Sequence, residues 1–237
     1  MDGDDARKAV HAALELGYRH IDTATNYGNE AAIGQALAES HVARDAVFLT
    51  TKLPGNASDV RATLEHSLAE LRVDFVDLWL LHWPPSRSYE PTSNTAAQLF
   101  TAMLAARNDG LVRAVGVSNF NLAEIDQLIA ATGEPPEVNQ IAWSPFRHFP
   151  LFRAELVRRG IVLEGYSPLQ TSPLDDPRLQ ALARAHGVTA AQLIVRWHLQ
   201  HRVIVIPKST NRDRIAENAA VFEFELDDAA MDILDHL

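Results

Sequence analysis

Cysteine is absent from this chain of 237 residues. Its absence excludes disulfide bonds, thiolate nucleophiles, and zinc or iron–sulfur centres that are held by cysteine. No apolar run approaches the roughly 18 residues that a membrane-spanning helix needs. The first ten residues, MDGDDARKAV, lack the basic and apolar regions of a secretory signal peptide. Together these absences predict a cytoplasmic protein that does not enter a membrane.

Basic side chains are in the minority. The chain has 21 lysines and arginines against 31 aspartates and glutamates, which gives a net charge of −10 at pH 7. Such a chain has few cations to neutralise a row of phosphates, so we expect no nucleic-acid partner. The same acidity disfavours docking on an anionic lipid surface. Nothing in the sequence indicates an obligate protein partner, and we expect a small-molecule ligand.

The glycine-rich nucleotide motifs are missing as well. No two of the 11 glycines lie two residues apart, so neither G-x-G-x-x-G nor a P-loop is present. What is present is a regular alternation of helical patterns with seven short apolar segments. These segments are residues 20–23, 47–52, 76–82, 112–119, 138–141, 161–167 and 203–208.

This alternation predicts a parallel sheet covered by helices. The segments are apolar throughout, as expected of strands that are buried on both faces. A doubly wound sheet and a (β/α)8 TIM barrel both fit the alternation, and the missing glycine motifs favour the barrel. No linker divides the chain, so we predict one α/β domain over residues 1–237. Among the helices, we expect one over residues 59–71 with Ser58 as its N-cap and another that begins after Asn121.

Hydrogen-bonding or ionisable side chains interrupt or end all seven predicted strands. They are Asp22, Thr23, Lys52, His82, Ser118, Asn119, Asn139, Gln140, Tyr166, Ser167, Lys208 and Ser209. A single buried histidine or lysine is more often a satisfied core residue than a functional one. In a barrel, however, the carboxyl ends of all strands meet on one face, where active sites lie. The repeated pattern therefore predicts a site on that face.

Four of these residues suggest a particular reaction. A phenol such as Tyr27 has an ordinary pKa near ~10, which is high for a proton donor at neutral pH. A lysine ammonium ~4 Å away would stabilise the phenolate by about 4 kcal/mol at an effective dielectric constant of ~20. Lys52 can supply that charge, and Asp22 can keep it protonated. With His82 to polarise a substrate oxygen, the set suits protonation of an oxyanion as a hydride arrives.

The motifs around these residues resemble those of the aldo-keto reductase family. Residues 17–30, GYRHIDTATNYGNE, are similar to the first signature of the family. FLTTKL, LWLLHWP, VGVSNF, VNQIAWSPF, EGYSPL and VIPKSTNRDRIAEN resemble its other conserved blocks, in the same order. The resemblance covers residues 5 to 236 and is greatest to bacterial diketogluconate reductases and general aldehyde reductases.

The resemblance implies a barrel that binds NADP(H) and reduces aldehydes or ketones to alcohols. It places the catalytic tetrad on Asp22, Tyr27, Lys52 and His82, with Tyr27 as proton donor. It also implies that Ser118, Asn119 and Gln140 hold the nicotinamide carboxamide and that Tyr166 stacks on the ring. Ser167 and Leu169 match positions near the pyrophosphate, and Lys208, Ser209, Arg214, Glu217 and Asn218 match the adenosine end. Trp83 is expected either to line the substrate pocket or to pack in the core.

Alternative interpretations of individual residues remain. His198 and His201 could ligate a metal, but no third ligand is evident, so we expect no metal site. The family pattern also leads us to expect an eighth strand before the first helix and a tail after residue 237. We therefore expect seven of the eight barrel strands here. The alternative to a working reductase is a nucleotide-binding barrel without turnover, or a fragment of a longer reductase.

Overall fold

The computed structural model describes residues 1–88 and 92–237. The strands are β1 (His20–Asp22), β2 (Phe48–Leu53), β3 (Val76–Leu81), β4 (Val112–Ser118), β5 (Val138–Ala142), β6 (Val162–Tyr166) and β7 (Ile204–Ile206). The helices are α1 (Gly3–Glu15), α2 (Glu30–Glu39), α3 (Val60–Leu71), α4 (Ala96–Asn108), α5 (Leu122–Thr132), α6 (Pro150–Arg158), α7 (Pro177–His186), α8 (Ala190–Gln200), α9 (Arg212–Ala219) and α10 (Asp228–Asp235). Short 3-10 turns are η1 (Thr25–Tyr27), η2 (Arg44–Ala46) and η3 (Pro85–Arg87).

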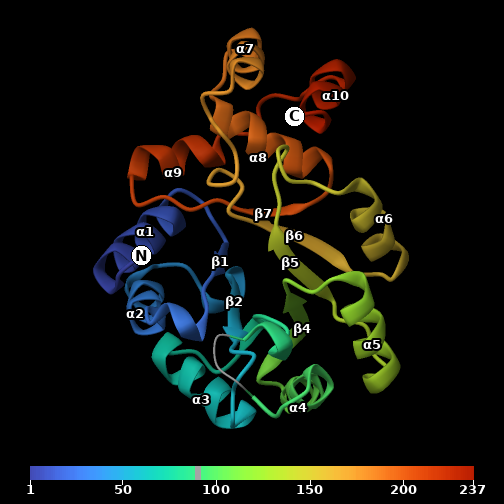
Figure 1. Ribbon diagram of the computed structural model, residues 1–237. Helices are drawn as coiled ribbons and strands as arrows, with labels where there is room; N and C mark the ends of the chain where they lie inside the picture. The colour runs from blue at the N-terminus through green and yellow to red at the C-terminus, as the bar shows by residue number, and fades with distance from the viewer. Residues whose placement is uncertain (89–91) are drawn as a thin grey trace.

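The strands form one seven-stranded parallel sheet whose spatial order follows the sequence from β1 to β7. The sheet curls into a nearly closed barrel with the helices around its outside (Figure 1). This order confirms the predicted barrel, because a doubly wound sheet would reverse its strand order partway along the sheet. No helix in the described part of the chain is long and apolar enough to cross a membrane.

The barrel is not closed by hydrogen bonds between its first and last strands. Among the described residues, β1 pairs only with β2 and β7 only with β6. The helices that flank these two edges are joined to each other. The Tyr18 hydroxyl, just after α1, donates to the Ile215 carbonyl oxygen of α9 at 3.1 Å. Arg212 of α9 forms a 2.5 Å ion pair with Glu15 of α1, so α1 and α9 hold the two edges in place from outside.

One of the two helix starts predicted from the sequence is confirmed, and the other is displaced by one residue. The side chain of Asn121 accepts from the Glu124 backbone and forms a capping box at the start of α5. The expectation that Ser58 caps α3 is wrong, because the cap is Asp59, whose side chain accepts from the Ala62 backbone. Both residue types are good caps, and the one-residue difference depends on which of them adopts the extended backbone at the helix start.

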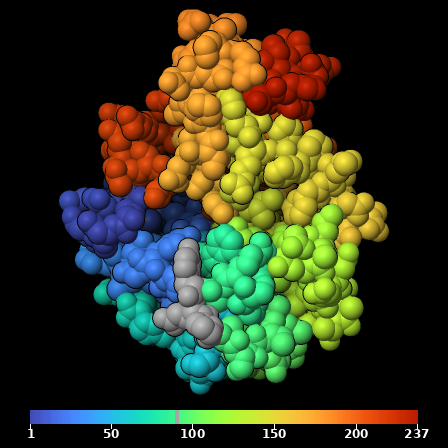
Figure 2. All heavy atoms as spheres, in the orientation of Figure 1, coloured from blue at the N-terminus to red at the C-terminus, as the bar shows by residue number. Residues whose placement is uncertain are grey.

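The barrel interior has an apolar side and a polar side. Leu78, Leu80 and Val138 pack together as a separate small cluster within β3 and β5. Gly116 of β4 permits this packing, because a Cβ atom there would lie 2.6 Å from the Val138 carbonyl oxygen. Buried polar side chains also point toward the site described next, and they are Lys52 of β2, Ser118 of β4, Gln140 of β5 and Glu164 of β6. The face in Figure 2 is hollowed between the blue N-terminal segments and the orange segments.

Candidate active site

The four residues expected to form a tetrad come together at the carboxyl ends of the first three strands. Asp22 is the last residue of β1, Lys52 lies near the end of β2, and His82 directly follows β3. Tyr27 lies on the turn η1 that follows β1, and the turn ends at Gly28, whose φ of 62° suits glycine. Their side chains meet because parallel strands end at the same face of a barrel.

Lys52 is completely buried, and its ammonium group is held at two oxygens. Nζ donates to Asp22 Oδ1 at 2.5 Å and to the Thr23 carbonyl oxygen at 2.8 Å. Burial alone would lower the pKa of Lys52, but the nearby Asp22 carboxylate and Tyr27 reverse this and raise the pKa above its usual value. Lys52 is therefore a permanently charged group at neutral pH. Its Nζ lies 5.2 Å from the centroid of the Tyr27 ring.

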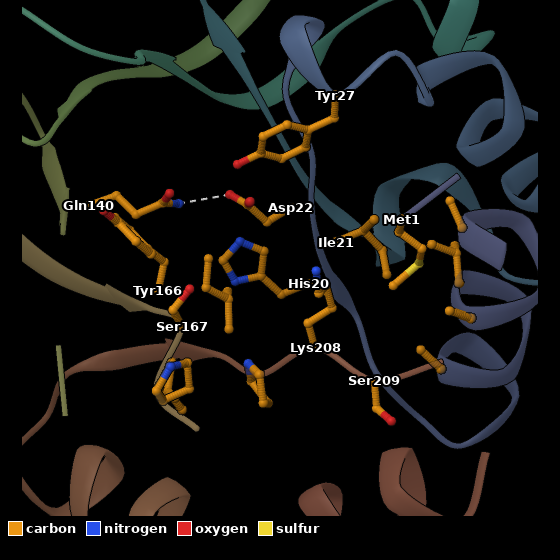
Figure 3. A pocket seen from close by; sticks show the side chains of 18 of the residues that line it. Met1, His20, Ile21, Asp22, Tyr27, Gln140, Tyr166, Ser167, Lys208 and Ser209 are labelled. Carbon is orange, nitrogen blue, oxygen red and sulfur yellow. Dashed lines mark hydrogen bonds between the residues drawn. The ribbon is translucent and has the colours of Figure 1, made fainter. Parts of the chain in front are cut away.

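Asp22 joins Lys52 to a second strand end. Its other oxygen, Oδ2, accepts a hydrogen bond from Gln140 Nε2 of β5 at 2.7 Å (Figure 3). In that view, the Tyr27 hydroxyl points into the same space as Asp22 and Gln140. The carboxylate is thus fixed by two donors from opposite sides and cannot rotate without losing one of them. This arrangement holds the lysine charge at a defined place beside the phenol.

His82 is a neutral imidazole at neutral pH. Burial and the positive charge of Lys52 lower its pKa to about 4. Its ring lies edge-to-face with Tyr27, with ring centroids 5.7 Å apart. Nδ1 is buried and has no hydrogen-bond partner among the residues that the structure describes. A neutral histidine beside an exposed phenol can donate one hydrogen bond to a substrate oxygen that approaches both.

The residues expected to hold the carboxamide form a hydrogen-bonded group on β4, β5 and β6. The Ser118 hydroxyl donates to the Gln140 carbonyl oxygen at 2.9 Å. The Tyr166 hydroxyl donates to Asn119 Oδ1 at 3.0 Å, and Asn119 Nδ2 donates to the His82 carbonyl oxygen at 3.1 Å. Asn119 has a φ of 66°, a strained value for a residue with a side chain. The group therefore connects the tetrad to the next strand ends.

One cavity of about 750 Å³ contains most of the predicted binding positions. The predicted residues that line it are Asp22, Tyr27, His82, Trp83, Ser118, Asn119, Gln140, Tyr166, Ser167, Leu169, Lys208, Ser209 and Asn218. Lys52 lies behind Asp22, buried. Arg214 and Glu217 are on α9 and do not line the cavity, although Asn218 of the same helix does. Within the described ranges, neither Lys208 nor Arg214 forms an ion pair, whereas Arg212 is bound to Glu15.

The two histidines weighed as metal ligands do not converge. His198 is buried with its ring nitrogens 2.7 and 3.0 Å from the Ile194 and Trp143 carbonyl oxygens. His201 Nε2 lies 2.7 Å from Asp235 Oδ1 of α10. Over residues 1–88 and 92–237, no group of three or more candidate ligands could hold a metal ion.

Sequence reasoning missed several buried polar residues near the site. His20 of β1 lines the cavity, and behind it Glu164 of β6 is fully buried with Oε1 3.8 Å from His20 Nε2. Burial, together with the Asp22 charge, raises the pKa of Glu164 to about 8. The signal was available, since both residues lie two positions before a site residue on a strand, and side chains two apart point the same way. Glu30 is a second case, described below.

Comparison with known proteins agrees with this geometry. The model of the Aldo/keto reductase family matches residues 1–237. An aldo-keto reductase of Mycolicibacterium smegmatis is 44% identical over 227 residues, which cover 94% of this chain and 81% of that protein. The glyoxal reductase of Bacillus subtilis is 40% identical over 240 residues, which cover 100% of this chain and 84% of that protein.

Solved structures show the same fold. An aldo/keto reductase from Brucella melitensis superposes with a TM-score of 0.93 at 38% identity, covering 100% of this chain and 89% of that one. The Bombyx mori aldo-keto reductase in complex with NADP gives a TM-score of 0.92 at 34% identity, covering 100% and 83%. The chain therefore belongs to the aldo/keto reductase family, oxidoreductases that use a nicotinamide cofactor to reduce carbonyl groups.

Proposed function

We propose that this chain uses NADPH to reduce small aldehydes or ketones at the Tyr27 centre. The observation that carries the proposal is that a half-exposed phenol and a neutral imidazole line one cavity, with a buried, aspartate-bound ammonium beside the phenol. This set can protonate an oxygen that gains negative charge, which is what the reduction of a carbonyl group requires. We also retain the prediction of a cytoplasmic location.

Tyr27 is proposed as the proton donor. It is 49% exposed and lines the cavity, so its hydroxyl can reach a bound carbonyl oxygen. As that oxygen takes the proton, the phenol becomes a phenolate. Lys52 Nζ lies 5.2 Å from the centroid of the Tyr27 ring, and a unit positive charge at about this distance stabilises a phenolate by about 3 kcal/mol at an effective dielectric constant of ~20. Asp22 keeps Lys52 charged despite its burial.

His82 is proposed to orient the carbonyl group. With a pKa near 4 it is uncharged at neutral pH, so it donates a hydrogen bond without adding a proton of its own. Its ring lies beside the Tyr27 ring, which supports the proposal that both donors reach the same substrate oxygen. Trp83, which follows it and lines the cavity, would bound the substrate on this side.

The lining of the cavity fits a nicotinamide dinucleotide. When bound, the reduced nicotinamide would supply the hydride. Ser118, Asn119 and Gln140 offer hydroxyl and amide groups for a carboxamide, and Tyr166 offers an aromatic face beside them. Ser167 and Leu169, which also line the cavity, would border the pyrophosphate. Lys208, Ser209, Arg214, Glu217 and Asn218 would hold the adenosine, with the two cations directed to a 2′-phosphate.

The substrate class is proposed from cavity chemistry and from one relative. The relative named glyoxal reductase acts, by that name, on a small dicarbonyl compound. We infer from this relative that the chain also accepts small dicarbonyl compounds, whose reacting oxygen would take the hydrogen bonds of both His82 and Tyr27. The rival interpretation, a barrel that binds nucleotide without turnover, gives no role to the buried Lys52–Asp22 pair.

The test uses purified protein with NADPH and methylglyoxal. The proposal predicts loss of NADPH absorbance matched by formation of the alcohol. Lys52→Met should lower turnover by about 10²-fold, the rate equivalent of the ~3 kcal/mol above. Binding of NADPH without any consumption of aldehyde would instead identify the barrel as inactive and overturn the proposal.

A further inference from the structure

Beneath the Tyr27 turn lies a buried group of polar side chains that the reaction does not use. Glu30, at the start of α2, is 4% exposed, and Thr51 of β2 and Ser67 of α3 are fully buried. Thr51 Oγ1 lies 2.5 Å from Glu30 Oε1, and Ser67 Oγ lies 3.0 Å from Glu30 Oε2. None of the three lines the cavity. They contact the turn through Thr25.

Thr25 connects this buried group to the strand of the catalytic lysine. Its hydroxyl oxygen lies 3.1 Å from Ser67 Oγ and 2.9 Å from the Lys52 carbonyl oxygen. A continuous chain therefore runs from Glu30 through Ser67 and Thr25 to Lys52. Thr25 is the first residue of the turn η1 and Tyr27 the last, so the chain of contacts passes two residues from Tyr27.

A close contact between two helices makes this chain possible. Gly34 lies one helical turn after Glu30 on the same face of α2. A Cβ atom at Gly34 would lie 2.3 Å from the Glu70 carbonyl oxygen of α3. Only glycine lets the two backbones approach so closely, and this approach brings the Glu30 carboxyl to Ser67.

The number of protons in the chain determines the state of Glu30. Its three links, from Glu30 to Ser67, from Ser67 to Thr25 and from Thr25 to the Lys52 carbonyl oxygen, need three protons. Each hydroxyl has one proton to donate, so the two hydroxyls supply two. If Glu30 were ionised, Ser67 would donate to it. Either the contact between Thr25 and Ser67 or that between Thr25 and Lys52 would then have no proton.

We infer that Glu30 is held as a neutral acid whose proton completes this chain and so fixes the Tyr27 turn against the Lys52 strand. Oε2 then donates to Ser67, Ser67 donates to Thr25, and Thr25 donates to the Lys52 carbonyl oxygen. The Thr51 hydroxyl donates to Oε1, the acceptor oxygen of the acid. Glu30 is a positioning residue, and this inference rests on the proposed function of Tyr27.

The surroundings of Glu30 favour the neutral form. Burial raises its pKa, and the hydrogen bonds that Thr51 and Ser67 would donate to an ionised carboxylate oppose this only in part. On α3, the helix packed against it, His66 lowers the pKa slightly and Glu70 raises it. Lys52 is adjacent to Thr51 on β2, but side chains alternate along a strand, and its ammonium group is bound to Asp22 instead.

Removal of the link at Thr25 tests the positional role. Thr25→Val keeps the shape of the side chain and deletes the hydroxyl. We expect kcat to fall by on the order of 10-fold to 10²-fold, because small displacements of a catalytic group are costly. The Kd for NADPH should change by less than about threefold, and Thr25→Ser should restore kcat. The matched control is Thr132→Val, which removes a hydroxyl that donates to the Leu128 carbonyl oxygen in α5.

Infrared spectroscopy tests the protonation of Glu30 without reference to activity. The difference spectrum between the unmodified protein and Glu30→Gln at pH 7 should show the carbonyl stretch of one protonated carboxyl group. Comparison with Glu30→Gln is needed because Glu164 also has a raised pKa. Absence of that band, or a Thr25→Val variant with unchanged kcat, overturns the inference. A protein without reductase activity would contradict the proposed function alone, since the band still reports on Glu30.

Discussion

The pair formed by Lys52 and Asp22 makes Asp22→Asn the most informative single substitution. The carboxylate accepts from Lys52 on one oxygen and from Gln140 on the other. Asparagine has one acceptor oxygen, so one of these donors loses its partner. In either orientation the asparagine is uncharged, so the fully buried ammonium of Lys52 loses the counter-charge of Asp22. Loss of one partner of a buried ion pair costs about 3–5 kcal/mol of unfolding free energy.

The pH dependence of stability gives this prediction a sign. In the unmodified protein the pKa of Lys52 is raised, so its stabilising effect is present at neutral pH and lost only as pH rises through that raised pKa. In Asp22→Asn, burial remains and the main opposing charge is gone, so the pKa of Lys52 falls below its usual value. Between these two pKa values, Lys52 is deprotonated in the folded variant but still protonated in the unfolded chain. Its stability should rise as pH increases from 7 toward 10.

Urea unfolding followed by tryptophan fluorescence measures both effects. Trp79, Trp143 and Trp197 are buried and report on the core. We expect Asp22→Asn to lose about 3 kcal/mol at pH 7 and less at pH 9. The double variant Asp22→Asn/Lys52→Met should recover part of this loss without recovering turnover. A single variant as stable as the unmodified protein at pH 7 would refute the reasoning.

Three further predictions concern the cofactor and the proton. Arg214→Met should weaken the binding of NADPH roughly tenfold and leave the binding of NADH almost unchanged, as measured by fluorescence titration. Equal losses of affinity for both would mean that Arg214 holds a group common to both cofactors. Because burial lowers the pKa of His82 to about 4, kcat/KM should stay level from pH 8 to near pH 5 and decline below that. A decline of kcat/KM with a midpoint near pH 6.5 that disappears in His82→Gln would contradict the lowered pKa of His82. Tyr166→Phe removes the hydroxyl that donates to Asn119 and should weaken the binding of NADPH roughly fivefold, as measured by calorimetry.

Local patterns were sufficient to predict the barrel and the convergence of Asp22, Tyr27, Lys52 and His82 at one end of it. The strand segments were recognisable because each is a short apolar run between predicted helices. The order of the strands in the sheet then follows from the alternation of strands and helices. Asp22, Lys52 and His82 could be grouped before any distance was known, because parallel strands end at one face. The N-cap at Asp59 could not be chosen over Ser58, since both residues can accept from the first helical turn.

Contacts between segments that are distant in the chain could not be predicted from the sequence. Glu30 is 37 positions from Ser67, and no local period indicates that α2 and α3 approach closely enough to join them. Gly34 is visible in the sequence, but its neighbour, the Glu70 carbonyl oxygen, is not. Likewise, the motif that matched Arg214 and Glu217 does not tell which way each side chain of α9 turns. Only Asn218 of these three lines the cavity.

The central claim is that Tyr27 gives the proton, and its hydroxyl can be removed alone. Tyr27→Phe should lower kcat for methylglyoxal reduction by ~10²–10⁴-fold, while the Kd for NADPH changes little, because the hydroxyl acts only as the oxyanion forms. Tyr18→Phe is the matched control, since Tyr18 also lines this cavity but its hydroxyl donates to the Ile215 carbonyl oxygen. Its kcat should stay within about threefold of the unmodified protein. Turnover by Tyr27→Phe at the rate of Tyr18→Phe would contradict the account.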